Sequence, residues 1–374
     1  MRVSSSVAAT ILVAATAGAC RPAPPPESPA PSVEQDSARA TITQRFYASR
    51  PFGSEAEFNP LSLVINGGYD QLRTGSYRYV ARVAYGTATK TILNSLVHPD
   101  AVLRQYGYAR WLRNEMFPLT TKGDGGGQWY PNYHLHLIAG GMTYARTVEW
   151  YEQHGVVSHP RIAAAATVYA WHFLTEIVEN GNRRPYDEDG FTDLAFFDAA
   201  SILLWNQGWL TRPFGGRLEF TDWPGQASLS FPGGTIENAY MLAMLRVPLP
   251  RTTNWKAMTT MGAAFLVGAS RRVGDNYWLS AAGGFDPADN PIIDQTTGRK
   301  SVSLEANAGL FVDRDGSLLV SMITKGGSNN GPTLNVYPGV LNRHAGIWVQ
   351  SVRGGGIRFG LVSRMGLGLS SFTQ

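Results

Sequence analysis

Residues 217–372 alternate between apolar and polar side chains and are divided by Gly-rich turns. Between 302 and 310 the even-numbered residues are Val, Leu and Ala, and the odd-numbered ones are Ser, Glu, Asn and Gly. A period of two is typical of β-strands whose two faces meet different surroundings. Turns at 313–316 and 354–356 predict hairpins whose second strands cover 318–324 and 357–364. This part of the chain therefore predicts an antiparallel β-sheet or a small β-barrel-like sheet.

Residues 92–212 are predicted to be mainly helical. Their proline, glycine and capping residues divide them into four helices, over 99–116, 131–153, 161–179 and 193–206, the last with Thr192 as its N-cap. Before them, residues 58–90 contain two apolar runs, 61–65 and 77–83, which we expect to be short strands. The predicted fold class is α+β, with about four helices in the middle packed on the C-terminal sheet. We expect residues 41–374 to form a single composite domain.

The chain begins with the pattern of a secretory signal. Arg2 precedes an apolar run from Val7 to Ala17, and small residues lead to Cys20, which is the only cysteine. This start resembles the lipobox of bacterial lipoproteins, which implies that residues 1–19 are removed and that Cys20 is lipidated. The Pro-rich residues 20–40 cannot build a core and are expected to be a linker. The expected location is the cell envelope, lipid-anchored at the outer membrane and facing the periplasm.

The amino-acid composition limits which classes of binding partner we expect. A net charge of +4 is too small to indicate a nucleic-acid-binding protein. Beyond the signal there is no run of 18 apolar residues, so we predict no membrane-spanning helix. We expect the membrane to be contacted through the lipid anchor, with an envelope protein as a possible partner. No cofactor is expected from any motif.

Six of the seven histidines lie between positions 98 and 172. His172, Glu176 and Glu179 fall on one face of the predicted third helix. Asp198 lies among apolar residues, so we predict that it is buried and paired with a histidine or arginine. Convergence of these helices would give a polar network, a metal site or an acid–base pair. The catalytic candidates are His134, His172, Glu176 and Asp198, and the metal candidates are His134, His136, His172 and Glu176.

The order of these residues is similar to that of VanZ-like membrane proteins. In residues 132–206 a His-bearing helix is followed by glutamates and then by an Asp-bearing helix. The segments 132–136 and 149–151 also resemble an uncharacterised bacterial envelope family. Neither resemblance implies a reaction. The expected function is therefore an outer-envelope lipoprotein with a structural or lipid-surface binding role. The alternative is a metal-assisted or acid–base hydrolase acting on an envelope lipid or glycan.

Overall fold

A computed structural model describes residues 46–73, 79–118, 129–180, 186–216, 218–287, 292–293, 300–301, 304–325 and 330–373. These residues belong to one compact unit, Gln44–Gln374. The signal, Cys20 and the linker at 20–40 lie outside the described residues, as do residues 77 and 78 of the expected strand 77–83.

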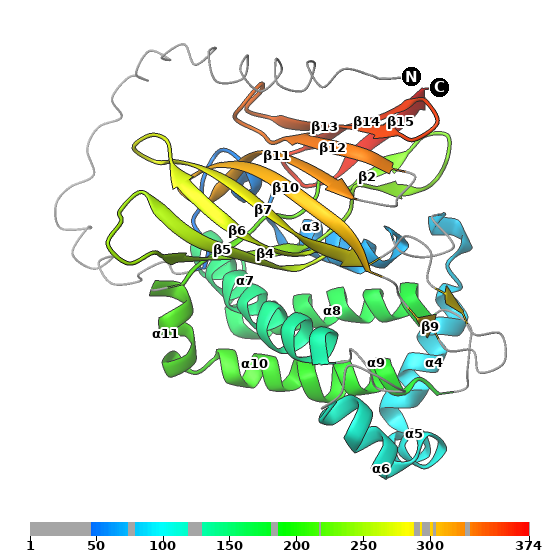
Figure 1. The fold of residues 1–374 in the computed structure, drawn as a ribbon. Helices are drawn as coiled ribbons and strands as arrows, with labels where there is room; N and C mark the ends of the chain where they lie inside the picture. The colour runs from blue at the N-terminus through cyan, green and yellow to red at the C-terminus, as the bar shows by residue number, and fades with distance from the viewer. Residues whose placement is uncertain are drawn as a thin grey trace. The chain divides into compact units, whose positions relative to one another are not determined.

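Helical elements occupy the first half of this unit (Figure 1). The α-helices are α3 (Pro60–Gly68), α4 (Tyr85–Val97), α5 (Pro99–Tyr106), α6 (Tyr108–Trp111), α7 (Gly141–His154), α8 (Pro160–Asn180), α9 (Glu188–Thr192), α10 (Ala199–Trp205) and α11 (Gly208–Gly216). Three segments are π-helical: η4 (Leu112–Met116), η5 (Tyr130–Gly140) and η6 (Asp193–Asp198). Three short 3₁₀ turns are η1 (Ser54–Ala56), η2 (Asp70–Arg73) and η3 (Val80–Arg82).

The second half forms one 13-stranded sheet in the order β1-β4-β5-β6-β7-β10-β11-β12-β13-β14-β15-β2-β3 (Figure 1). Neighbouring strands are antiparallel except β15 and β2, which are parallel. The strands are β1 (Glu219–Asp222), β2 (Ser228–Ser230), β3 (Ile236–Glu237), β4 (Leu242–Pro248), β5 (Trp255–Gly262), β6 (Phe265–Arg272), β7 (Tyr277–Pro287), β10 (Leu304–Arg314), β11 (Ser317–Lys325), β12 (Asn330–Val336), β13 (Ala345–Val352), β14 (Ile357–Ser363) and β15 (Gly368–Thr373). Strands β8 (Ile292–Ile293) and β9 (Lys300–Ser301) form a separate pair.

The predicted fold class is wrong. The sheet ends at β1 and β3, which do not pair, so it is not closed into a barrel-like form. The helices are spread along residues 54–216 and do not make a central region of four. The expected helix 99–116 is divided because Gly107 has a φ of 96°, a conformation that interrupts the helix. The two predicted hairpins are present, as β10–β11 and β13–β14.

The expected strands in 58–90 are also absent from the described residues of that segment. Residues 61–65 lie in α3, because Asn59 caps the helix by accepting a hydrogen bond from the backbone N–H of Ser62, and Pro60 takes the first helical position. Val80–Arg82 is a 3₁₀ turn, and Tyr79 contributes only an isolated bridge to Thr235. Capping residues therefore outweigh the β-propensity of the apolar run here.

Both faces of strand β4 are buried, each in a different core. Ala243 and Leu245 pack in a cluster with Met142 of α7 and Trp205 of α10. Leu242 and Met244 point to the opposite face and pack in a second cluster. The helices thus cover one face of the sheet where β1, β4 and β5 lie. We call this the outer face of the sheet, and the opposite one the inner face.

Arg146 joins the helical elements to the sheet. Its guanidinium is completely buried and lies 2.8 Å from Glu55 of η1 and also pairs with Asp222 of β1. It also lies over the ring of Phe58, 3.7 Å from its centroid. Burial raises the pKa of Asp222 to about 6, although the charge of Arg146 lowers it. One cation therefore compensates two carboxyl groups that have left water.

Arg146→Ala should lower the free energy of unfolding by about 3–5 kcal/mol, because both carboxyl groups would stay buried without their cation. Urea denaturation measures this change. Arg353→Ala, which alters an exposed arginine, should change it by less than about 0.5 kcal/mol. Equal stabilities for the two variants would show that Arg146 does not join the two parts.

Candidate functional site

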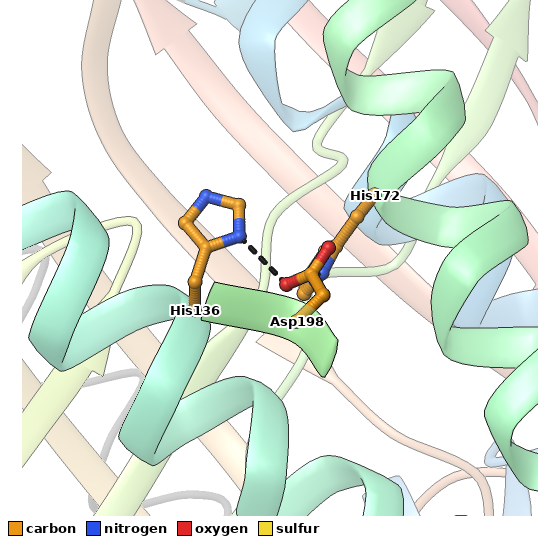
Figure 2. A group of neighbouring side chains, drawn as sticks. All are labelled: His136, His172 and Asp198. Atoms are coloured by element: carbon orange, nitrogen blue, oxygen red, sulfur yellow. Dashed lines mark hydrogen bonds and ion pairs between the residues drawn. The ribbon is translucent and has the colours of Figure 1, made fainter. Parts of the chain in front are cut away.

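Three helical elements bring ionisable side chains together inside the helical part. His136 comes from η5, His172 and Glu176 come from α8, and Asp193 and Asp198 come from η6. All five are buried. Figure 2 shows that His136 and His172 approach the carboxylate of Asp198 from two different helices. The cluster therefore depends on the packing of elements that are far apart in sequence.

The π-helical backbone of η6 aligns its two aspartates. In an α-helix residues five apart point in directions that differ by about 140°, so Asp193 and Asp198 would diverge. In a π-helix the hydrogen bonds join residues five apart, and both side chains then share a face. Both carboxylates consequently contact His136. Such π-helical segments are frequent at functional sites.

Asp198 is the centre of the histidine contacts. Its Oδ1 accepts a hydrogen bond from Nδ1 of His136 at 3.0 Å (Figure 2). Nδ1 of His172 lies 2.6 Å from the same oxygen and pairs with it. The prediction that Asp198 is buried and paired with a histidine is thus confirmed. The other nitrogen of His136, Nε2, lies 3.3 Å from Oδ2 of Asp193.

Two glycines make room for the cluster. A Cβ at Gly190 would lie 2.7 Å from Oε2 of Glu176, and a Cβ at Gly140 would lie 3.0 Å from Cε1 of His172. Glycine therefore lets the backbone of α9 approach Glu176 and the end of η5 approach the His172 ring.

Asp187 begins α9 by accepting hydrogen bonds from the backbone N–H groups of Asp189 and Gly190. The expected N-cap at Thr192 is wrong, because the helical backbone already starts at Glu188.

The electrostatics of the cluster are dominated by crowded carboxyl groups. Burial raises the pKa of Glu176 well above its usual value, and the charges of Asp193 and Asp189 raise it further. Burial lowers the pKa of His136, but Asp193 and Asp198 outweigh this and raise it to about 9. Burial would raise the pKa of Asp198, yet the two histidines lower it to about 2. The cluster therefore holds more carboxyl groups than histidines, and burial favours the protonated form of Glu176.

Two buried oxygens of the cluster have no hydrogen-bond partner among the described residues: Oδ1 of Asp193 and Oδ2 of Asp198. Buried polar groups in proteins are nearly always paired. A carboxylate also costs far more to bury than a neutral group. Within the described part of the chain, the side chains that could hold a metal ion form two sets, His136 with His172 and Asp198, and His136 with Glu176 and Asp193.

The structure brings together most of the candidates named from sequence. His136, His172, Glu176 and Asp198 lie in the cluster. His134 does not, and its ring instead stacks on Tyr130 with centroids 5.5 Å apart. His134 and His136 point to different sides of η5, as their spacing predicts. Asp193 was missing from the candidates, and the signal that could have found it is an acidic pair five residues apart in an apolar segment.

No family model matches this chain, and no curated protein or solved structure matches it either. The resemblance of residues 132–206 to VanZ-like proteins therefore stays a prediction. Within the described residues, no helix is both long and apolar enough to cross a bilayer.

The stability of the metal-free protein should depend on pH through Asp193. Burial raises the pKa of this carboxyl from 3.8 to about 7, with the charge of His136 opposing the rise. The stability that the protonated group contributes is therefore present below about pH 4 and lost as pH rises through 7. Asp193→Asn lacks this loss. Its free energy of unfolding relative to wild type should rise by at least about 1 kcal/mol between pH 5 and pH 8 in chelator-treated samples. A constant difference would mean that Asp193 is already ionised at pH 5.

Proposed function

We propose that this protein is a lipid-anchored envelope protein with a divalent metal ion bound by His136, Asp193 and Glu176, and that the ion serves a hydrolase. The distances favour this set over the other one. Two ligands of one tetrahedral ion at about 2.1 Å lie about 3.4 Å apart. Nε2 of His136 and Oδ2 of Asp193 are 3.3 Å apart. His172 and Asp198 are 2.6 Å apart, which is the distance of an ion pair rather than of two ligands.

Asp198 then has a supporting role. Metal-binding histidines usually donate their second ring N–H to a carboxylate, which sets the tautomer and the orientation of the ring. Nδ1 of His136 donates to Asp198, so the lone pair of Nε2 is directed toward Asp193. His172 holds Asp198 from the other side. These contacts are those expected of groups around a metal ligand.

The observation that carries the proposal is the convergence of buried ligand atoms from His136, Glu176 and Asp193, which all lie within 4.8 Å of one another. Carboxyl groups buried so close together would otherwise favour their protonated forms. An ion bound at Nε2 of His136 would instead compensate the carboxylates of Asp193 and Glu176. Metal binding would therefore lower the cost of burying these groups together.

A three-ligand site is typical of catalysis because a fourth position remains for water. A bound ion would lower the pKa of water in that position and so supply a nucleophile for a carbonyl or phosphoryl centre near neutral pH. In the hydrolysis the bond to the leaving group would break as the bond to the water oxygen forms, and the leaving group would take up a proton. The side chain of His136 is 11 % exposed, which is more than the side chains of His172, Asp193 and Asp198. Substrate would therefore approach from the side of His136. With the lipidation signal, the substrate class is an envelope lipid or glycan.

Metal content tests the proposal directly. Purified wild-type protein incubated with Zn²⁺ or Co²⁺ and then desalted should retain about one ion per chain. His136→Ala and Asp193→Asn should lose it. His134→Ala, a matched change in the same helical segment, should retain it. Retention by all four proteins, or by none, would contradict the assigned ligands.

Hydrolysis is tested separately, by incubating metal-loaded protein with extracted envelope lipids or glycans and measuring released products. Products should form with wild type and disappear with Asp193→Asn. Stoichiometric metal without any product would make the ion structural. That result would favour the structural role as the function of the site.

The anchor has its own test. Metabolic labelling with a fatty-acid analogue should mark the wild-type chain and leave Cys20→Ser unmarked, because Cys20 is the only thiol. Equal labelling of both chains would show that lipid is attached elsewhere.

A further inference from the structure

The outer face of the sheet becomes exposed beyond β5, and there it is apolar. Strand pairing aligns one row of outward side chains across eight strands from β7 to β2. In order, the row consists of Leu279, Val312, Val320, Val336, Ile347, Leu361, Leu369 and Leu229. Leu361 and Leu369 are 60 % and 67 % exposed. Water therefore meets a continuous strip of aliphatic side chains.

A second row runs parallel to the first. It contains Ala281, Leu310, Met322, Leu334, Val349 and Phe359 in successive strands from β7 to β14. Along β10 the outward residues Leu304, Ala306 and Ala308 are exposed as well. On the described parts of β7 and β10–β15, the one charged residue that points outward is Arg314, at the end of β10. The two rows thus belong to a wide surface without internal charge.

The inner face of the same strands is buried and mixes polar side chains with apolar ones, among them Phe311 and Trp348. Ser280, Ser321 and Asn335 are fully buried there, and the amide of Asn335 donates a hydrogen bond to Ser321. Ser270 and Ser280 share another hydrogen bond, of 2.7 Å. In water-soluble antiparallel sheets the apolar face is the covered one. Here apolar side chains line the exposed face as well, as they do on strands in contact with lipid.

We propose that the outer face of β7, β10–β15 and β2 contacts the acyl chains of a lipid bilayer. An exposed apolar surface of this extent marks an interaction site. A protein partner would leave polar groups within the interface, since such interfaces are only about 56–65 % apolar and carry many hydrogen bonds. The two rows offer no hydrogen-bonding side chain at all. Hydrocarbon chains match a surface of this kind.

The length of chain before the domain agrees with this occupant. Residues 21–45 separate Cys20 from Phe46, the first described residue. Fully extended, about 25 residues span at most about 80–90 Å. A lipid on Cys20 would hold the domain within that distance of a bilayer. Lipid contact by the sheet does not depend on the proposed metal site, which lies among the helices.

Site-specific labelling tests the proposal on the full chain. In a Cys20→Ser background, Leu361→Cys carries a polarity-sensitive fluorophore, and vesicles of phosphatidylethanolamine and phosphatidylglycerol contain brominated acyl chains. The label at 361 should shift its emission to the blue and be quenched by bromine. The matched control is Leu203→Cys on α10, an apolar position that is 68 % exposed. Its label should show neither effect.

The outcomes separate the possible occupants. An unquenched label at 361 overturns the proposal. The proposal is also overturned if the label is shielded from water in the absence of vesicles and this shielding increases with protein concentration, since a second copy would then cover the face. As a further check, Leu361→Asp combined with Leu369→Asp should abolish co-flotation of the Cys20→Ser chain with vesicles. An unchanged midpoint of urea denaturation would show that this variant still folds, and continued flotation would count against the proposal.

Discussion

The buried guanidinium of Arg146 is the interaction on which the arrangement of the two halves depends. It reaches Glu55 in the first turn of the domain and Asp222 in the edge strand β1, from within α7. Helix α7 continues directly from η5, which carries His136. The position of the cluster relative to the sheet is therefore set by a charge that has no access to water. Hydrophobic packing around Met142 and Trp205 reinforces this contact.

The charges in the cluster around His136 are balanced differently from those around Arg146. Around Arg146, one cation is shared by two carboxyl groups. Around His136, the buried carboxyl groups of Glu176, Asp193 and Asp198 meet two histidines, and the charges of Asp193 and Asp189 raise the pKa of Glu176. Carboxyl groups whose pKa values are strongly shifted are concentrated at functional sites in proteins. A permanently charged guanidinium pairs with the carboxyl groups at one place, whereas the other relies on titratable histidines, and this difference supports a bound ion at the second place.

Sequence reasoning succeeded where local rules decide the structure and failed where the backbone departs from regular geometry. Turn residues located the hairpins β10–β11 and β13–β14 because glycine at 316 and at 354–356 adopts positive φ. The apolar run 61–65 was assigned to a strand because its length suits one, yet Asn59 and Pro60 start a helix. Asp193 was not among the named candidates, and in a regular α-helix it would point away from Asp198. No sequence pattern in the chain predicts a π-helix, so the contact between Asp193 and His136 could be found only from the structure.

The two faces of the sheet are a second feature that the sequence alone does not determine. Alternation in residues 304–314 correctly separates the side chains into two sets, since a strand's period is two. It does not say which set faces the interior, because that depends on what surrounds the sheet. Asn307 and Asp313 are buried, whereas Leu304 is 62 % exposed. In water this arrangement would be unfavourable, at roughly 25 cal/mol for each Å² of apolar surface left exposed. The sheet is consistent with stability if hydrocarbon replaces water on its outer face, and the lipid anchor expected at Cys20 would place the domain beside such a phase.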